Sequence, residues 1–194
     1  MPAAVPLHAP RTDPPRKRFT RQDVDRMQSA GLFTGLRCEL IQGDLIDKMS
    51  QNPPHANCVR LLNALLAEIH GAKRVQSQLP IEVAAADQQW SLPEPDLAVL
   101  TPSHTPAEAR FQKRHPRGDE TTLVVEVADS SLQHDLTVKR DLYARAGVPE
   151  YWALDVASRR LILHRQSNAG AYSSILTLTG QDSAGPFPVS ALFP

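Results

Sequence analysis

Apolar residues spaced three and four apart indicate helices along this chain. Thr20 followed by Asp23 is typical of a helix start, and Gly31 of its end. Asn52-Pro53 is expected to begin a longer helix, whose apolar stripe consists of Cys58, Leu61, Leu62, Leu65, Leu66 and Ile69. A third helix is expected over 132–146, because Gly147 follows its last turn.

Between these helices, short apolar runs indicate β-strands. Two runs within 38–47 flank Gly43-Asp44 and predict a β-hairpin. Residues 101–120 are polar and contain three prolines, so we expect a loop with at most a short helix. Helices mixed with strands in this order predict an α/β or α+β fold class, with helices packed on a sheet. The other expected strands are 75–85, 97–100, 123–128, 151–156 and 161–165.

The first 18 residues have no apolar periodicity and contain five of the 17 prolines. Because proline fixes φ and removes a backbone donor, we expect 1–18 to be a flexible basic arm. Residues 19–194 are then expected to form one domain of ordinary size. The arm has a charge of +3, from four basic residues minus Asp13. A basic arm can touch phosphates, but a solvated tail is the commoner outcome.

Composition and charge limit the classes of function. Hydrophobic residues make up 41% of the 194 residues, which together with nine glycines is typical of a globular protein. The 21 basic and 21 acidic residues cancel, which excludes a protein that coats nucleic acid through bulk charge. Residues 101–118 carry +3, from four basic residues minus Glu108, so with the arm at +3 the remainder is at −6. Such basic segments could hold phosphates beside an acidic core, or simply be solvated.

The cysteines and the lengths of the apolar runs indicate a soluble cytoplasmic protein. Cys38 and Cys58 form no CxxC pair, and no neighbouring histidine completes a zinc-binding pattern. Two reduced, buried thiols are therefore favoured over a single bridge. No apolar run reaches the roughly 18 residues needed to cross a bilayer. Prolines also interrupt the N-terminus, where a signal peptide would need a continuous apolar core.

Three carboxylates lie within or beside apolar strands. Alternation along 123–127 places Glu126 on the face opposite its apolar neighbours. Asp96 precedes the strand 97–100, and Glu39 opens the hairpin. An ionised carboxylate in such a place is costly unless it is paired or binds a metal. For each one alone, an ion pair or a strand-end carboxylate in water is the alternative.

Three such carboxylates on neighbouring strands favour a shared site. Hard cations such as Mg²⁺ (or Mn²⁺) take oxygen ligands, commonly one or two carboxylates plus substrate phosphate. Asp96 and Glu126 would supply that set. The combination fits metal-assisted phosphodiester hydrolysis better than a covalent mechanism, and Ser130-Ser131 are expected to cap a helix.

A lysine interrupts the inward-facing stripe of the third expected helix. Lys139 shares one helical face with Leu132, Leu136 and Tyr143, at spacings of four, three and four. Its ammonium can point at the carboxylates and orient a water molecule, or it can snorkel to solvent. Asp135, one turn earlier, can pair with it or simply favour the first turn of the helix.

Several short runs follow one another in a specific order: Glu39-Leu40-Ile41-Gln42-Gly43, Pro54-His55, Pro93-Glu94-Pro95-Asp96, Glu126-Val127-Ala128-Asp129-Ser130-Ser131 and Glu150-Tyr151-Trp152-Ala153-Leu154-Asp155. Asp135, Lys139, Tyr143 and Gly147 lie between the last two runs. Together they resemble the Uma-type restriction endonucleases of the PD-(D/E)xK nuclease superfamily, over residues 19–194. The resemblance implies a restriction-endonuclease-like fold, a mixed β-sheet flanked by helices with acidic residues at one edge. It also implies a metal-dependent endonuclease acting on DNA.

The resemblance also implies roles for individual residues. Asp96 matches the Asp of the PD motif, Glu126 the first acidic position of (D/E)xK, and Glu39 an early glutamate of such sites. The motif lysine would fall at Ala128, so either Lys139 supplies the ammonium or the site lacks one. Asp96 and Glu126 would then hold the metal, Glu39 would assist, and Lys139 would position the attacking water.

Two rival functions and the substrate contacts stay open at this point. The absence of lysine at position 128 favours a catalytically silent nucleic-acid-binding or regulatory module with the same fold. A metal-dependent hydrolase of a small phosphoester would use the same carboxylates. His55 and Gln78 are candidate substrate-binding residues, although a helix cap and an ordinary strand position also explain them. A homodimer would suit the two strands of a DNA duplex.

Overall fold

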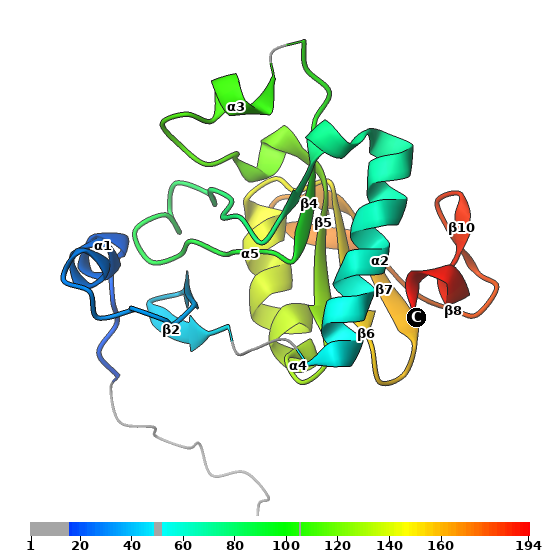
Figure 1. Ribbon diagram of the computed structural model, residues 1–194, viewed down its shortest axis with the longest axis horizontal. Helices are drawn as coiled ribbons and strands as arrows, with labels where there is room; N and C mark the ends of the chain where they lie inside the picture. The colour runs from blue at the N-terminus through cyan, green and yellow to red at the C-terminus, as the bar shows by residue number, and fades with distance from the viewer. Residues whose placement is uncertain (1–15, 49–51, 105) are drawn as a thin grey trace, which may run out of the picture.

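The computed structural model describes residues 16–48, 52–104 and 106–194, and its centre is a six-stranded sheet. The strands follow the order β3–β4–β5–β6–β7–β8 in space (Figure 1). β5 and β6 pair in parallel and the other neighbouring pairs are antiparallel, so the sheet is mixed, as predicted. The strands are β3 (Val75–Ser77), β4 (Leu97–Leu100), β5 (Thr121–Ala128), β6 (Glu150–Asp155), β7 (Arg160–Asn168) and β8 (Ala171–Thr179).

Helices cover both faces of the sheet, because its central strands are apolar on both sides. The helix α2 (Pro53–His70) packs on the face that carries Leu97 and Val125. The opposite face, which carries Val124, packs against α5 (Arg140–Arg145). The buried stripe of α2 is narrower than predicted, since Ile69 is 41% exposed in its last turn. The buried residues of this helix are Cys58, Val59, Leu62 and Leu66.

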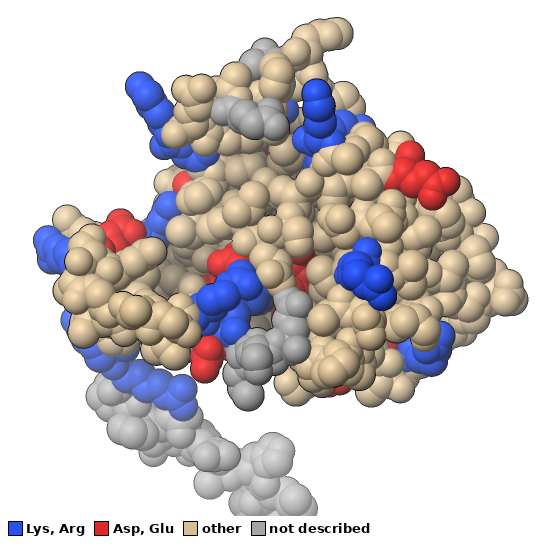
Figure 2. All heavy atoms as spheres, in the orientation of Figure 1, with Lys and Arg blue, Asp and Glu red and all other residues tan. Residues whose placement is uncertain are grey.

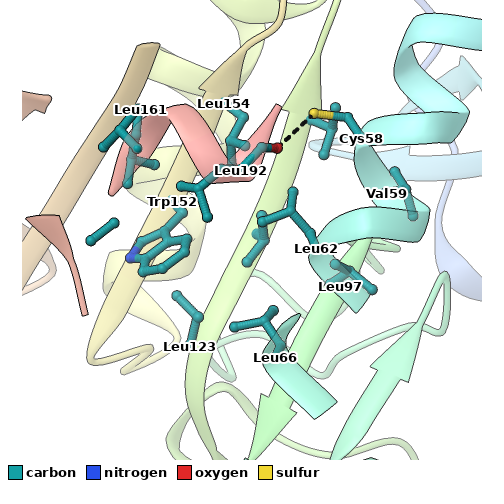
Figure 3. Close-up of a cluster of buried hydrophobic side chains, with 14 of the residues drawn as sticks. Cys58, Val59, Leu62, Leu66, Leu97, Leu123, Trp152, Leu154, Leu161 and Leu192 are labelled. Atoms are coloured by element: carbon teal, nitrogen blue, oxygen red, sulfur yellow. Dashed lines mark hydrogen bonds between the residues drawn. The ribbon is translucent and has the colours of Figure 1, made fainter. Parts of the chain in front are cut away.

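The core beneath α2 is closed by the C-terminal segment (Figure 3). Two short strands, β9 (Ser183–Ala184) and β10 (Phe187–Pro188), lead into the 3-10 helix η4 (Val189–Leu192). Cys58 donates a hydrogen bond from Sγ to the carbonyl oxygen of Leu192 at 3.2 Å. Both cysteines are free thiols, as predicted, although Cys38 is only half-buried.

A helix and a hairpin form a lobe beside the sheet (Figure 1). The helix α1 (Arg21–Ser29) begins at the predicted capping box, formed by Thr20 and Asp23. The hairpin pairs β1 (Cys38–Ile41) with β2 (Asp44–Asp47). Its turn is Gln42-Gly43, one residue earlier than predicted.

The hairpin is held against the segment that leads into β4. Leu92 donates from its backbone N to the carbonyl oxygen of Leu40 at 2.8 Å, and Gly43 donates to the carbonyl oxygen of Trp90 at 2.7 Å. Gly43 has a φ of 87°, a conformation that glycine adopts without strain. This docking fixes the position of β1, and therefore of Glu39, relative to the sheet.

Two expected elements differ from the structure, and the strand β8 was not expected. The strand expected over 75–85 is only β3, because Gln78 has a φ of 52° and the chain leaves the sheet there. The helix expected over 132–146 consists of α4 (Leu132–His134), a π-helical segment η3 (Asp135–Lys139) and α5. The edge strand β8 is not predicted from the sequence, and its adjacent Ile175 and Leu176 are both exposed rather than alternating.

Three short helical elements lie in the remaining described segments. They are α3 (Ala107–Arg110) and the 3-10 turn η2 (Gly118–Glu120) in the polar loop after β4, and η1 (Ala72–Arg74), which joins α2 to β3. Residues 1–15 of the predicted arm lie outside the described residues, and Arg18 at its end lies over the Trp90 ring, 4.7 Å from the centroid. In the described part of the chain, no helix combines the length and apolarity that a membrane span requires.

Candidate active site

Two adjacent strands bring the predicted metal-binding carboxylates to one end of the sheet. Leu97 of β4 pairs with Val125 of β5, so Asp96 and Glu126 lie one position beyond that pair on neighbouring strands. Each of the two acidic residues is 3% exposed. Asp96 Oδ2 accepts a hydrogen bond from the backbone N of Val127 at 2.9 Å, which fixes this carboxylate against β5.

The ammonium of Lys139 lies among carboxylates. Its Nζ is 2.6 Å from Glu39 Oε1, 2.9 Å from Glu126 Oε1 and 3.9 Å from Asp135 Oδ1. Lys139 is 3% exposed, so it does not snorkel to solvent. The Tyr143 hydroxyl donates to the same Glu126 oxygen at 2.6 Å. Lys139 and Tyr143 therefore face the carboxylates from one side of the helix, as their spacing predicts.

The π-helical segment η3 places two of these charges. Asp135 and Lys139 are its first and last residues, and π-helical segments are frequent at functional sites. Ser131 donates from Oγ to Asp135 Oδ2 at 2.6 Å. Ser131 stands at the N-cap position of α4, as predicted, but its side chain makes no capping hydrogen bond to the backbone, and its hydroxyl orients Asp135 instead.

Glu39 reaches the cluster from the hairpin. It is 4% exposed, and its Oε2 accepts a hydrogen bond from the backbone N of Glu94 at 3.0 Å. Its Oε1 contacts Lys139. Both oxygens of Glu39 are therefore engaged within the protein, which fits a residue that positions Lys139 better than a metal ligand.

One ammonium cannot neutralise three carboxylates, and the pKa values of the cluster reflect this. Burial alone would lower the pKa of Lys139, but the neighbouring carboxylates, Glu126 foremost, outweigh burial and raise it. Burial raises the pKa of Glu126 to about 7, although Lys139 and Lys48 act in the opposite direction. Burial likewise raises the pKa of Asp135. The charged form of Lys139 is therefore favoured, while burial favours the protonated form of Glu126.

His55 binds Asp96 and does not cap α2. Asn52 is the cap, and its Oδ1 accepts a hydrogen bond from the backbone N of His55 at 3.0 Å. His55 Nε2 lies 3.3 Å from Asp96 Oδ2. Burial acts to lower the pKa of His55, but the hydrogen bond to Asp96 and its charge raise it above the ordinary value. Burial acts to raise the pKa of Asp96, yet His55 and Lys48 hold it below the ordinary value.

We expect the substitution Asp96→Asn to lower the pKa of His55, because it removes the charge that stabilises the imidazolium. An NMR titration of the His55 ring in both proteins measures this shift, and Asp44→Asn, at an exposed position, is the control. Since the folded-state pKa of His55 is the raised one, its contribution to stability is present below the unfolded pKa of roughly 6.5. That contribution is lost as the pH rises through the folded pKa. Identical His55 titrations in Asp96→Asn and wild type would contradict the ion pair.

The charged residues line one cleft of about 630 Å³. Figure 2 shows acidic and basic side chains meeting in a hollow between the hairpin lobe and the sheet. Gln78 lies at its rim, just past β3, where its Oε1 accepts a hydrogen bond from Arg37 Nη1 at 2.9 Å. All six residues singled out from the sequence line this cleft: Glu39, His55, Gln78, Asp96, Glu126 and Lys139.

Four more residues belong to this region. The sequence analysis already placed Asp135 and Tyr143 near Lys139 by their helical spacing, without assigning them to the site, but it missed the other two. Arg37 and Lys48 flank the hairpin and also line the cleft. No sequence pattern indicated that Arg37 and Lys48 line the cleft, because the hairpin was predicted from its apolar runs and these two residues lie outside them.

The basic loop 101–118 lies at the other end of the sheet. β4 runs away from Asp96 into this loop, and β5 returns from it toward Glu126, so α3 and α4 are at opposite ends in Figure 1. Within the loop, Arg114 pairs with Glu120 at 2.6 Å. The interpretation that this loop holds phosphates for the acidic core is therefore wrong for this cleft.

The free oxygens of the cleft suit a hard cation that keeps water ligands. Asp96 Oδ1 and Glu126 Oε2 accept no hydrogen bond from the described residues, in contrast to the oxygens of Glu39. Within residues 16–48, 52–104 and 106–194, no group of three or more His, Cys, Asp or Glu could hold a metal ion. Mg²⁺ commonly needs only one or two carboxylates besides water and substrate phosphate. The residues present therefore fit Mg²⁺ or Mn²⁺ and do not fit a structural zinc site.

Comparisons with known proteins match this architecture. The family model "Uma2: Putative restriction endonuclease" matches residues 21–190. A crystal structure described as "a putative nuclease belonging to DUF820", from Anabaena variabilis ATCC 29413, is similar to this chain with a TM-score of 0.62 and 16% sequence identity. The similarity covers 81% of this chain and 85% of that chain, and at this identity it shows the fold. No curated protein matches the chain.

Proposed function

This chain belongs to the Uma2 family of putative restriction endonucleases, and we propose that it is a metal-dependent endonuclease that hydrolyses phosphodiester bonds in DNA. The observation that carries the proposal is geometric. Asp96, Glu126 and Lys139 come from two strands and a helix, and their side chains line the same cleft. Carboxylates beside a buried ammonium are the chemistry that phosphodiester hydrolysis with a divalent cation needs.

Asp96 and Glu126 are the proposed ligands of Mg²⁺ or Mn²⁺, because each keeps one oxygen free of hydrogen bonds from the described residues. When bound, the cation would polarise the scissile phosphate and lower the pKa of a water molecule. Glu126 would have to be ionised to bind the cation, so binding would release the proton that burial favours on this residue. His55 holds Asp96 ionised and oriented at 3.3 Å.

Lys139 is the proposed residue that positions the attacking water. An ammonium has three donors, and two carboxylate oxygens lie within 3 Å of Lys139 Nζ, at 2.6 and 2.9 Å. One donor is therefore left for a water molecule beside Glu126. Glu39 and Tyr143 hold Lys139 and Glu126 in place from the hairpin and from α5.

The catalytically silent alternative rested on Ala128, which stands where the motif lysine would be. Ala128 is buried in β5, yet Lys139 brings its Nζ to 2.9 Å from Glu126 along another route. The helix thus supplies in space the ammonium that the strand lacks in sequence. This contact favours an enzyme over a silent binding module.

Incubation of purified protein with supercoiled plasmid tests the proposal. We expect nicked and linear products with Mg²⁺ or Mn²⁺ and none with EDTA, because the two carboxylates alone do not activate water. Binding of duplex DNA without cleavage in either metal would favour the silent module. Hydrolysis of nucleotides or small phosphoesters without plasmid cleavage would favour a metal-dependent hydrolase of a small phosphoester.

The finer assignments are part of the same proposal. His55 and Gln78 are the proposed substrate contacts, since both line the cleft. A homodimer would place two such clefts on a duplex by two-fold symmetry. Its measurement is the molar mass in solution by light scattering.

A further inference from the structure

Two basic residues lie side by side at the open end of the hairpin. Lys48, just after β2, donates from its backbone N to the carbonyl oxygen of Arg37, just before β1, at 2.8 Å. Both side chains line the cleft that holds Asp96 and Glu126. The charge of Lys48 also acts to lower the pKa of both carboxyl groups, so its ammonium is within electrostatic reach of them.

Glu94 contacts the side chains of both Arg37 and Lys48. Arg37 forms an ion pair with the Glu94 carboxylate through Nη2, and Lys48 donates from Nζ to the Glu94 carbonyl oxygen. The Arg37 side chain is 51% exposed and that of Glu94 only 16%. Because the Arg37 end of this ion pair is exposed to solvent, a competing anion can reach the guanidinium and replace the Glu94 carboxylate.

We propose that Arg37 and Lys48 bind the phosphate backbone of duplex DNA beside the scissile bond, and that Glu94 holds this phosphate site in the absence of DNA. The inference deepens the proposed function and rests on it. A guanidinium binds a phosphate through two parallel hydrogen bonds, and the neighbouring ammonium adds a point charge. Asp47 and Asp129 line the same cleft and would repel the backbone, so these two cations set the path along which it can approach.

The position of Glu94 in the chain also allows phosphate to replace its carboxylate. Glu94 is two residues before Asp96, and its backbone N binds Glu39 Oε2 at 3.0 Å. The carboxylate of Glu94 can therefore swing away while its backbone remains fixed in the site. DNA binding would release Arg37 without disturbing the carboxylates that hold the cation.

Fluorescence anisotropy with a fluorescein-labelled DNA duplex tests this inference, in EDTA so that no cleavage occurs. Each phosphate contact contributes about −0.9 to the slope of log K against log salt concentration. We expect Arg37→Gln and Lys48→Gln each to weaken binding about tenfold and to reduce the slope by about 1. Lys73→Gln, at an exposed position in η1 at the other end of α2, is the matched control and should change neither.

Glu94→Gln should have the opposite effect, because it removes the competing carboxylate and keeps the size of the side chain. We expect binding at least about twofold tighter. A structural role of the ion pair alone would instead make all three variants bind equally or more weakly. Slopes that match the Lys73→Gln control in both Arg37→Gln and Lys48→Gln would overturn the inference, and so would a wild type that binds no duplex.

The two proposals fail in different ways. If the slopes change as expected but no metal supports cleavage, the phosphate site stands and the endonuclease does not. If plasmid is cleaved while the slopes are unchanged, the endonuclease stands and the backbone contacts another surface.

Discussion

The substitution Asp96→Asn should lower the rate of metal-dependent DNA cleavage by roughly a hundred- to a thousandfold, because stabilisation of charge by a metal is worth several kcal/mol. Asparagine keeps the size of the side chain and loses the charge. Asp96 is one of the two proposed ligands, with one oxygen free of described partners, and His55 already holds its other oxygen. The measurement is the initial rate of plasmid nicking at saturating Mn²⁺.

Asp44→Asn is the matched control for this loss, because Asp44 is exposed in β2 on the same hairpin lobe. We expect it to cleave at the wild-type rate. Equal cleavage by Asp96→Asn and wild type would show a contaminating nuclease or another site. An unchanged thermal unfolding curve for Asp96→Asn separates loss of chemistry from loss of fold.

The substitution Lys139→Met should destabilise the protein by about 3–5 kcal/mol at pH 8, the usual cost of removing one partner from a buried ion pair. Three carboxylates, those of Glu39, Glu126 and Asp135, then share a buried site without an opposite charge. The wild-type lysine stays charged over the working range, since its neighbours raise its pKa above the ordinary value. Urea unfolding measures the loss.

The loss should depend on pH with a definite sign. Without Lys139, the pKa values of Glu126 and Asp135, which burial already raises, rise further, so these two groups favour the protonated form in the fold. Their penalty is small below roughly pH 4 and grows as the pH rises through the folded pKa values. We therefore expect the difference from wild type to be larger at pH 8 than at pH 5.

Two further variants make this second prediction specific. The exposed Lys73→Met should stay within about 0.5 kcal/mol of wild type. The double variant Lys139→Met/Glu126→Gln should recover part of the loss, because it removes one of the unpaired charges. A loss under about 1 kcal/mol, or one that is independent of pH, would contradict a buried ion cluster.

Local periodicity determined much of this protein before any coordinates. Alternation along 123–127 predicted that Glu126 lies on the face opposite Val125 and Val127, which in the structure belong to the core beneath α2. Helical spacing predicted that Lys139 and Tyr143 share a face. These patterns have periods of two and 3.6 residues, so they need only the neighbouring sequence. The order of the motifs also predicted the family, and the match of the family model over residues 21–190 confirms it.

Local rules failed where a segment's conformation depends on what packs against it. The strand expected over 75–85 stops at Ser77, and the helix expected over 132–146 contains a π-helical segment. β8 is an edge strand with two adjacent exposed apolar residues, so its pattern does not alternate. Each failure lies where tertiary contacts overrule propensity.

Only the tertiary structure decided which charged groups of the site contact one another. Glu39 and Lys139 are 100 positions apart, yet docking of the hairpin brings them to 2.6 Å. The same docking engages both oxygens of Glu39, while Asp96 and Glu126 each keep one free of described partners. It also sets Arg37 and Lys48 at the rim and leaves the basic loop at the far end of the sheet. The sequence determined which charges the chain has, and the long-range packing of its segments decided which of them meet.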